Sequence, residues 1–117
     1  MAVDNNEGVY YTTHAFPEPG GRLEAFLTRF EEEKGGAIEN GSFGGLAADA
    51  VLIAIEGYLT AGNLDGPAIA AAIAEIEGLE TVTGTTTYAG TDGVPDRPVY
   101  IHQIVDGTPT LAATIGG

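Results

Sequence analysis

The side chains of this sequence that could do catalytic chemistry are two histidines, His14 and His102. A histidine acts as a general base or a metal ligand when a second histidine or a carboxylate stands at a suitable spacing from it. Neither lies in a His-Glu-x-x-His pattern or beside a paired carboxylate in the sequence. A lone strand histidine is more often structural. The sequence therefore predicts a protein that is not an enzyme and holds no metal, with a histidine general base as the weakest alternative.

A glycine-rich segment, Gly41-Ser-Phe-Gly-Gly45, is the nearest match to a ligand-binding loop. It precedes a predicted helix, and the backbone amides at a helix N-terminus can receive a carboxylate or another anion. A flexible loop without a ligand is the alternative. The sequence has no phosphate loop, dinucleotide-binding glycine pattern or nucleophile elbow. It also has no cysteine, which excludes a thiolate nucleophile and a disulfide framework. We expect no cofactor.

The elements that would position these residues begin with a strand over residues 8–16, which is rich in aromatic and β-branched side chains. Prolines and glycines at residues 17–21 end this strand. A helix follows, because apolar residues recur at the spacing of one helical face: Leu23, Phe26, Leu27 and Phe30. The helix is expected to end at Lys34 and Gly35. The polar, glycine-rich residues 37–45 are then expected to form a loop.

A second helix is expected over residues 46–61, and its apolar residues nearly encircle it. Asp49 and Glu56 are its only charged residues. A helix that is apolar almost all round is a buried one, so we expect it to pack between a sheet and other helices or against a partner. Gly62 ends it, and Asp65 with Pro67 predicts the start of a third helix that reaches about Glu77.

The rest of the sequence reads as β-structure, with strands expected over residues 81–89, 99–105 and 110–114. Asp106-Gly107 lies between the last two and is a strong signal for a tight hairpin. The chain of 117 residues suits one domain, which we take as residues 1–117. The predicted fold class is α/β, with three helices packed on a small mixed sheet.

The charge balance is strongly acidic, with four Lys and Arg against 17 Asp and Glu and a net charge of −13. Such a charge repels phosphate backbones and anionic lipid surfaces, so we expect no nucleic-acid partner. Adaptation to salty surroundings explains the acidity without any specific partner. The first residues lack the features of a signal peptide, and no window approaches the length of an apolar membrane span.

The order of these elements, together with five short segments, resembles a known family. The segments are Gly8-Val-Tyr, Ala48-Asp-Ala-Val51, Ala61-Gly62, Val82-Thr-Gly84 and Val105-Asp-Gly107. They resemble the C-terminal portion of type 1 periplasmic solute-binding proteins, in the branched-chain amino acid (leucine, isoleucine, valine) binding family of ATP-driven (ABC) importers. The resemblance covers Glu7 to Ala113. It implies a non-enzymatic protein in which two lobes, joined by three crossover strands, close on a ligand.

The resemblance also implies a location, partners and a site. The full-length protein would be periplasmic or extracellular and would deliver an aliphatic amino acid or related small acid to a membrane permease. Phe43 aligns with a family aromatic residue that lines the cleft, with Ser42 and Gly44 beside it. Tyr11 and His14 would lie near the cleft at the end of the first strand. A core position for Phe43 is the equal alternative.

The chain departs from the family at Ala48, where the family has tyrosine, and in the extra glycines Gly44 and Gly45. The groups that hold the ligand's ammonium and carboxylate in full-length relatives lie outside this chain. We therefore expect the isolated chain to bind ligand weakly or not at all.

A different class of function remains open, an interaction module that binds no small molecule. The nearly all-apolar face from Leu46 to Leu59 would then pack against another subunit. This face predicts a homodimer or a higher homo-oligomer.

Overall fold

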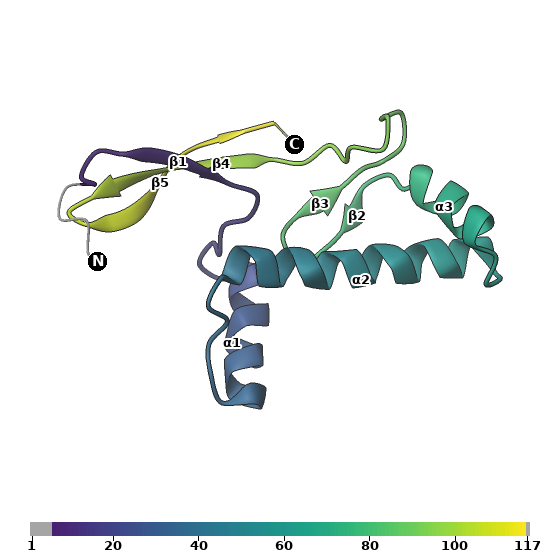
Figure 1. The fold of residues 1–117 in the computed structure, drawn as a ribbon, viewed down its shortest axis with the longest axis horizontal. Coiled ribbons are helices and arrows are strands. Elements are labelled where there is room, and N and C mark those ends of the chain that lie inside the picture. The colour runs from purple at the N-terminus through teal and green to yellow at the C-terminus, as the bar shows by residue number, and fades with distance from the viewer. Residues whose placement is uncertain (1–5, 117) are drawn as a thin grey trace.

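The structure, a computed structural model, describes residues 6–116. The elements in chain order are β1 (Tyr10–Thr13), α1 (Arg22–Lys34), α2 (Gly41–Ala61), α3 (Gly66–Ala74), β2 (Leu79–Glu80), β3 (Thr85–Thr86), β4 (Val99–Val105) and β5 (Thr108–Ile115). They form two parts that lie side by side (Figure 1). The sheet part contains β1, β4 and β5, and the helical part contains the three helices with β2 and β3. Two crossover segments, residues 14–21 and 87–98, connect the parts.

The sheet part is a three-stranded antiparallel sheet in the order β1-β4-β5. Alternate residues of β4 are buried, as expected for a strand with one covered face: Tyr100, His102 and Ile104. Asp106 and Gly107 connect β4 to β5 and both have positive φ, 51° and 71°. These values suit a tight type I′ turn, whose twist matches that of the flanking strands. The predicted hairpin is confirmed.

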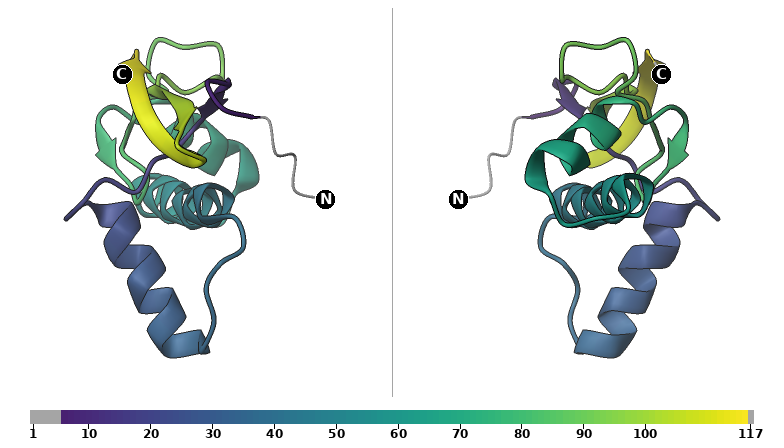
Figure 2. Two further views of the ribbon diagram at one scale, coloured as in Figure 1. Left: turned by 90° about the vertical axis from the view of Figure 1, so that its left-hand side faces the viewer. Right: turned by 90° about the vertical axis from the view of Figure 1, so that its right-hand side faces the viewer.

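The helical part begins with α1, which packs against the first turns of α2 through two glycines of α2. A Cβ atom at Gly41 would lie 2.9 Å from Leu27 Cδ1, and one at Gly45 would lie 2.6 Å from Leu23 Cδ1. Leu23 is buried and belongs to the predicted apolar stripe of α1. α1 therefore projects away from the N-terminal end of α2 (Figures 1 and 2). Glycine at these two positions lets the helices approach closely.

At the other end of α2, helix α3 folds back along it (Figure 2). The contact is close, because a Cβ at Gly57 of α2 would lie only 2.5 Å from Ile73 Cγ1. Asp65 caps α3 by accepting a hydrogen bond from the Ala68 amide at 3.1 Å. The expected start of α3 is confirmed within one residue, and the helix ends at Ala74, three residues before the expected end.

Helix α2 begins five residues earlier than predicted, at Gly41. The Asn40 side chain accepts a hydrogen bond from the Phe43 amide at 3.2 Å, and the Gly44 amide donates to the Asn40 carbonyl at 3.0 Å. The asparagine cap thus holds glycine-rich residues in a helix that their own propensity disfavours. The prediction of a loop over residues 37–45 is wrong for residues 41–45.

The strand predicted over residues 81–89 is also wrong. Two strands of two residues, β2 and β3, flank a turn at residues 81–84. Thr81 donates two hydrogen bonds to the Gly84 carbonyl, from its amide at 2.8 Å and from its hydroxyl at 2.6 Å. These bonds satisfy Thr81 inside the turn, so the β-branched residues do not extend into one strand.

Within the described chain α2 is not a buried helix, although its sequence predicts one. Only Gly45, Asp49 and Gly57 of α2 are buried, and all three face α1, α3 or the β2–β3 turn. Large apolar side chains of α2 are exposed, and Leu59 and Val51 expose 65% and 59% of their surface. The prediction of burial is wrong here because the described residues cover only one face of the helix.

The overall dimensions agree with this open arrangement. The radius of gyration is 16.8 Å and the principal extents are 53 × 35 × 27 Å. A compact domain of this length would have a radius of gyration of about 13 Å. The chain is therefore extended, with a small core rather than one large one.

α2 is also long and apolar enough to cross a membrane, by length and composition alone. The expectation that no window approaches a membrane span is therefore wrong, because the 21 residues of α2 carry only two charges, on Asp49 and Glu56. Core helices of water-soluble proteins pass the same test. α2 contacts α1, α3 and the β2–β3 turn through Asp49 and its glycines.

Candidate functional site

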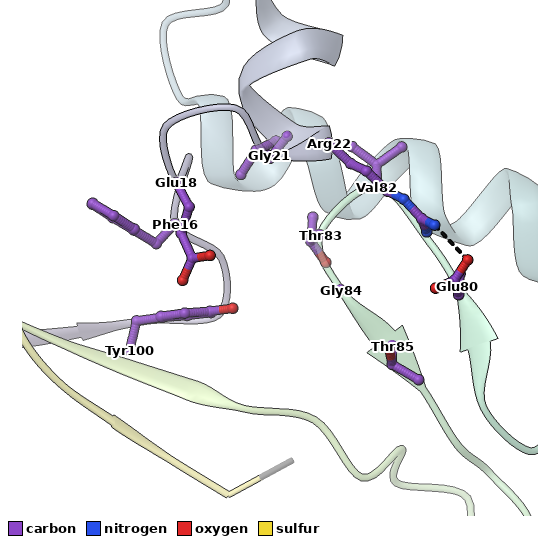
Figure 3. A pocket seen from close by; sticks show the side chains of 11 residues that line it. Phe16, Glu18, Gly21, Arg22, Glu80, Val82, Thr83, Gly84, Thr85 and Tyr100 are labelled. Carbon is purple, nitrogen blue, oxygen red and sulfur yellow. Dashed lines mark hydrogen bonds and ion pairs between the residues drawn. The ribbon is translucent and has the colours of Figure 1, made fainter.

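A cavity of about 250 Å³ lies where the sheet part meets the helical part (Figure 3). The first crossover contributes Phe16 and Glu18, and β4 contributes Tyr100. Arg22 at the start of α1 and residues 80 and 82–85 around the β2–β3 turn form the opposite side. The cavity therefore joins residues that lie far apart in the sequence.

The side of the cavity nearest the sheet is aromatic. The rings of Phe16 and Tyr100 lie 6.3 Å apart and are tilted by 37°, a favourable arrangement for two aromatic rings. Tyr100 is 8% exposed, and its hydroxyl points toward the helical part (Figure 3). Burial raises the pKa of Tyr100, and the negative charge of Glu18 raises it further, while Arg97 acts in the opposite direction. The hydroxyl is therefore neutral at physiological pH and can donate a hydrogen bond.

The opposite side of the cavity is polar. Arg22 forms an ion pair with Glu80 and donates a hydrogen bond to the Thr81 carbonyl at 3.4 Å. The two charged side chains are 54% and 70% exposed, so solvent screens the pair and it contributes little stability. Its effect is to fix the position of the Arg22 side chain at the edge of the cavity.

Behind this polar side lies a buried network centred on Asp49, which is 1% exposed. Its Oδ1 atom accepts from the Val82 and Thr83 amides at 2.8 and 3.2 Å. Its Oδ2 atom accepts from the Thr83 hydroxyl and from Arg97 Nη2, the latter at 2.6 Å. A buried carboxylate is stable only with such partners. The network attaches the β2–β3 turn to α2 and brings together two of the segments that carried the family resemblance.

The structure places the five predicted site residues in two groups. Ser42, Phe43 and Gly44 form part of the first two turns of α2 rather than a loop. Phe43 is 67% exposed, so its alternative role as a core residue is wrong for the described chain. Tyr11 lies on β1 and stacks on His102, with ring centroids 4.9 Å apart. His14 follows β1 and is exposed.

None of these five residues lines the cavity. The α2 group is nonetheless adjacent to it. Gly45, two residues after Phe43, packs against Leu23 and Thr83, and both of these line the cavity.

His102 has a structural environment. It is 3% exposed and lies between the rings of Tyr11 and Phe16. The Thr13 hydroxyl lies 2.8 Å from His102 Nε2, within hydrogen-bond distance, and donates to the Ala15 carbonyl at 2.9 Å. The other ring nitrogen, Nδ1, is buried and has no hydrogen-bond partner among the described residues. A base in this position is closed to a substrate, which argues against His102 as a general base.

The sequence did not single out the residues that line the cavity. Phe16 and Tyr100 could be recognised only as aromatic residues near the ends of predicted strands. Arg22 could have been noticed from composition, because it is one of only four cationic residues in the sequence. Arg97, which belongs to the network behind the cavity, is another of the four. Among residues 6–116 no group of three or more His, Cys, Asp or Glu side chains is placed to hold a metal ion.

Comparison with known proteins is consistent with this arrangement. A leucine-binding protein from Thermotoga maritima has a TM-score of 0.80 and 21% identity, over 97% of this chain and 32% of that protein. A substrate-binding protein of an ABC transporter from Desulfitobacterium hafniense, solved with leucine, has a TM-score of 0.70 and 23% identity, over 91% of this chain and 31% of that one.

A third structure is a leucine-, isoleucine-, valine-, threonine- and alanine-binding protein from Brucella ovis in a closed conformation. It has a TM-score of 0.73 and 19% identity, over 98% of this chain and 33% of its own. The chain thus spans about a third of the length of these solved proteins and shares their fold. No curated protein sequence matches it significantly.

The family comparison is more decisive than these low identities. The sequence profile of a family described as periplasmic binding protein matches residues 1–109, which is nearly the whole chain. The α/β fold class with three helices and the resemblance noted in the sequence are confirmed, and the chain belongs to the periplasmic binding protein family.

Proposed function

We propose that this chain is the C-terminal portion of a solute-binding protein of an ABC-type amino acid importer. It would bind its ligand without chemical change, in a cleft between two lobes. The observation that carries the proposal is the family match over residues 1–109. The fold shared with two proteins named for leucine binding, and with a third solved with leucine, supports an aliphatic amino acid or a related small acid as ligand.

The geometry of the chain is compatible with this function. Its sheet and helical parts are connected by two crossover segments, the arrangement expected where the lobes of a hinged binding protein meet. The cavity at this junction holds about 250 Å³. Small-molecule sites usually enclose about 300–1,000 Å³. The chain would therefore supply one wall of a site that the rest of a two-lobed protein completes, and it would bind weakly in isolation.

Phe43 is the residue of this chain that we propose for contact with the ligand's apolar side chain. It is exposed on the first turn of α2, so a ligand could contact its ring without displacing another described residue. Ser42 and Gly44 would contribute to the same wall, as would Tyr11 and His14 at the end of β1. The Asn40 side chain accepts from the Phe43 amide, so an anion at this helix end would be bound by the amides of Gly41 and Ser42.

The proposal includes a location and a partner. Members of this family are periplasmic binding proteins, so we propose a periplasmic or extracellular location for the full-length protein. Its partner would be the membrane permease of the importer.

The test is a calorimetric titration of the protein expressed from its whole reading frame, with leucine, isoleucine, valine and a panel of small acids. Saturable binding of at least one aliphatic amino acid supports the proposal, and the isolated 117 residues should give little or no heat. A folded full-length protein that binds none of them would refute it. So would a reading frame that encodes these 117 residues alone.

A second function, an interaction module that forms homo-oligomers, is favoured by one specific observation. Val51, Ile55, Tyr58 and Leu59 of α2 are each more than 40% exposed and lie on a helix that the sequence marks as buried. Contiguous exposed apolar surface promotes association. Sedimentation equilibrium at micromolar concentration distinguishes the functions, because a stable oligomer that gives no heat with any ligand favours the module.

A further inference from the structure

The two parts of this chain can move relative to each other only where the crossover segments are free to bend. The described chain has two such segments, residues 14–21 and 87–98. Arg22 at the start of α1 follows the first segment directly, and Arg97 is the second-last residue of the second segment.

The second crossover returns to the helical part before it enters β4. Residues 88–95 form a loop whose ends meet at an isolated bridge between Thr87 and Asp96, with the Asp96 amide donating to the Thr87 carbonyl at 2.9 Å. Arg97 follows at once and binds Asp49, with Nη2 2.6 Å from Oδ2, and the Thr83 hydroxyl. Since β4 begins at Val99, only Pro98 lies between the buried ion pair and the sheet.

The first crossover is held in a similar way. On the sheet side, the Thr13 hydroxyl donates to the Ala15 carbonyl at 2.9 Å, which keeps Ala15 with β1. On the helical side, Arg22 binds Glu80 and the Thr81 carbonyl. The Gly20 amide also donates to Glu24 Oε2 at 2.7 Å, and the Ala25 amide donates to the Gly21 carbonyl at 3.1 Å, so both glycines belong with α1. Residues 16–19, which include two prolines, lie between the attachments.

Both arginines bind the same short segment, residues 80–83, from different directions. Arg22 holds its beginning and Arg97 holds its end through Thr83. The turn is itself fixed to α2, because Asp49 accepts from the Val82 and Thr83 amides. The chain has only four cationic residues against 17 acidic ones. Two of these four contact this one turn.

We propose that Arg22 and Arg97 form a clamp that holds both crossovers on the β2–β3 turn, and that this clamp confines bending between the two parts to residues 16–19 and Pro98. Arg97 is the dominant anchor, because its ion pair is 17% and 1% exposed against 54% and 70% for Arg22 and Glu80. The clamp acts on motion within this chain, so its test does not depend on whether the chain binds a ligand.

The test measures distances between two spin labels by pulsed electron paramagnetic resonance in the 117-residue chain. The chain has no cysteine, so each double-cysteine variant carries only the two labels. Thr28→Cys on α1 with Ala112→Cys on β5 reports on the two parts, and both positions are exposed. Thr28→Cys with Thr60→Cys reports on the helical part alone.

Each pair is measured in the parent chain and in Arg97→Gln, Arg22→Gln and Arg29→Gln. Arg29 is the matched control, because its only described ion pair, with Glu33, lies on the surface of α1.

We expect Arg97→Gln to broaden the distance distribution between the parts about twofold, and Arg22→Gln to broaden it less, because a buried ion pair constrains more than an exposed one. The distribution within the helical part and both distributions in Arg29→Gln should not change. Unchanged distances between the parts in both clamp variants would overturn the proposal. Equal broadening within the helical part, or broadening in Arg29→Gln, would do the same. If Arg97→Gln fails to fold, the same criteria are applied to the distance distributions of Arg22→Gln alone.

Discussion

Arg97 Nη2 lies 2.6 Å from Asp49 Oδ2 in a buried ion pair between residues that are 48 positions apart in the sequence. Asp49 is on α2 and Arg97 is at the end of the crossover that leads into β4. The same carboxylate holds the β2–β3 turn through the Val82 and Thr83 amides. One side chain therefore connects a helix, a turn and a crossover, and its removal should affect all three.

Replacement of Asp49 by alanine should strongly destabilise the helical part. The change leaves Arg97 without its partner and leaves the Val82 and Thr83 amides without their acceptor. Loss of one member of a buried ion pair costs about 3–5 kcal/mol. Urea unfolding followed by circular dichroism at 222 nm measures the free energy of unfolding. Glu56→Ala is the control, because it removes the other charge of α2, for which the described residues provide no ion pair. The prediction is wrong if the two variants unfold at the same urea concentration.

Replacement of Gly57 by alanine should also destabilise the protein, although alanine favours helices over glycine by about 1 kcal/mol. The new Cβ would lie 2.5 Å from Ile73 Cγ1, so α2 and α3 must move apart. Such overpacking costs about 1–3 kcal/mol. Thermal unfolding checks the result. Gly66→Ala should leave the melting temperature the same or higher, because no atom lies within 4 Å of its added Cβ. A raised melting temperature for Gly57→Ala would show that α3 does not pack on α2 as described.

The ionisation of Tyr100 provides a prediction about pH. Burial and the charge of Glu18 raise its pKa in the folded state. The folded state therefore holds this proton more tightly than the unfolded state, in which a tyrosine has a pKa of about 10. The contribution of Tyr100 to the free energy of unfolding is constant below that pH and falls as the pH rises from there through the folded-state pKa.

The measurement is a difference titration of phenolate absorbance between the parent chain and Tyr100→Phe. Subtraction isolates Tyr100 from the other four tyrosines. The difference curve should have its midpoint above pH 10, the usual value for a tyrosine. A midpoint at or below that value would contradict the buried position of the hydroxyl beside Glu18.

Self-association through α2 should be sensitive to a charge on its exposed face. Leu59 is 65% exposed and lies on this face. Leu59→Glu places a carboxylate in the contact, which must then be desolvated, and should shift a homo-oligomer toward monomer in sedimentation equilibrium. Thr28→Glu on the exposed surface of α1 is the control. A parent chain that is wholly monomeric at micromolar concentration, or an oligomer that both variants leave intact, would contradict association through this face.

The sequence predicted the local features of the fold well. The stripe of apolar residues in α1, the cap at Asp65 and the Asp106-Gly107 turn are determined by neighbouring residues, and the structure confirms all three. The start of α2 was missed because Gly41 to Gly45 suggest a loop. They form a helix because Asn40 caps them and because α1 packs against Gly41 and Gly45.

The features that sequence reasoning missed depend on distant residues. The cavity joins Phe16 and Tyr100 to the β2–β3 turn, and no local pattern reports that proximity. The ion pair of Asp49 with Arg97 is equally non-local. The apolar character of α2 did predict burial, but residues 6–116 cover only one of its faces, so the prediction fails within the described chain.

The most direct test of the central claim is the calorimetric titration of the full-length protein with leucine, isoleucine and valine, carried out in parallel with Phe43→Ala. We predict saturable binding of at least one of these amino acids and a weaker affinity in Phe43→Ala. The unfolding midpoint should not change, because Phe43 is exposed. The isolated 117 residues should show little or no binding. A folded full-length protein that binds none of the three, or equally tight binding by the isolated chain, would contradict the claim that this chain forms one wall of an amino acid site between two lobes.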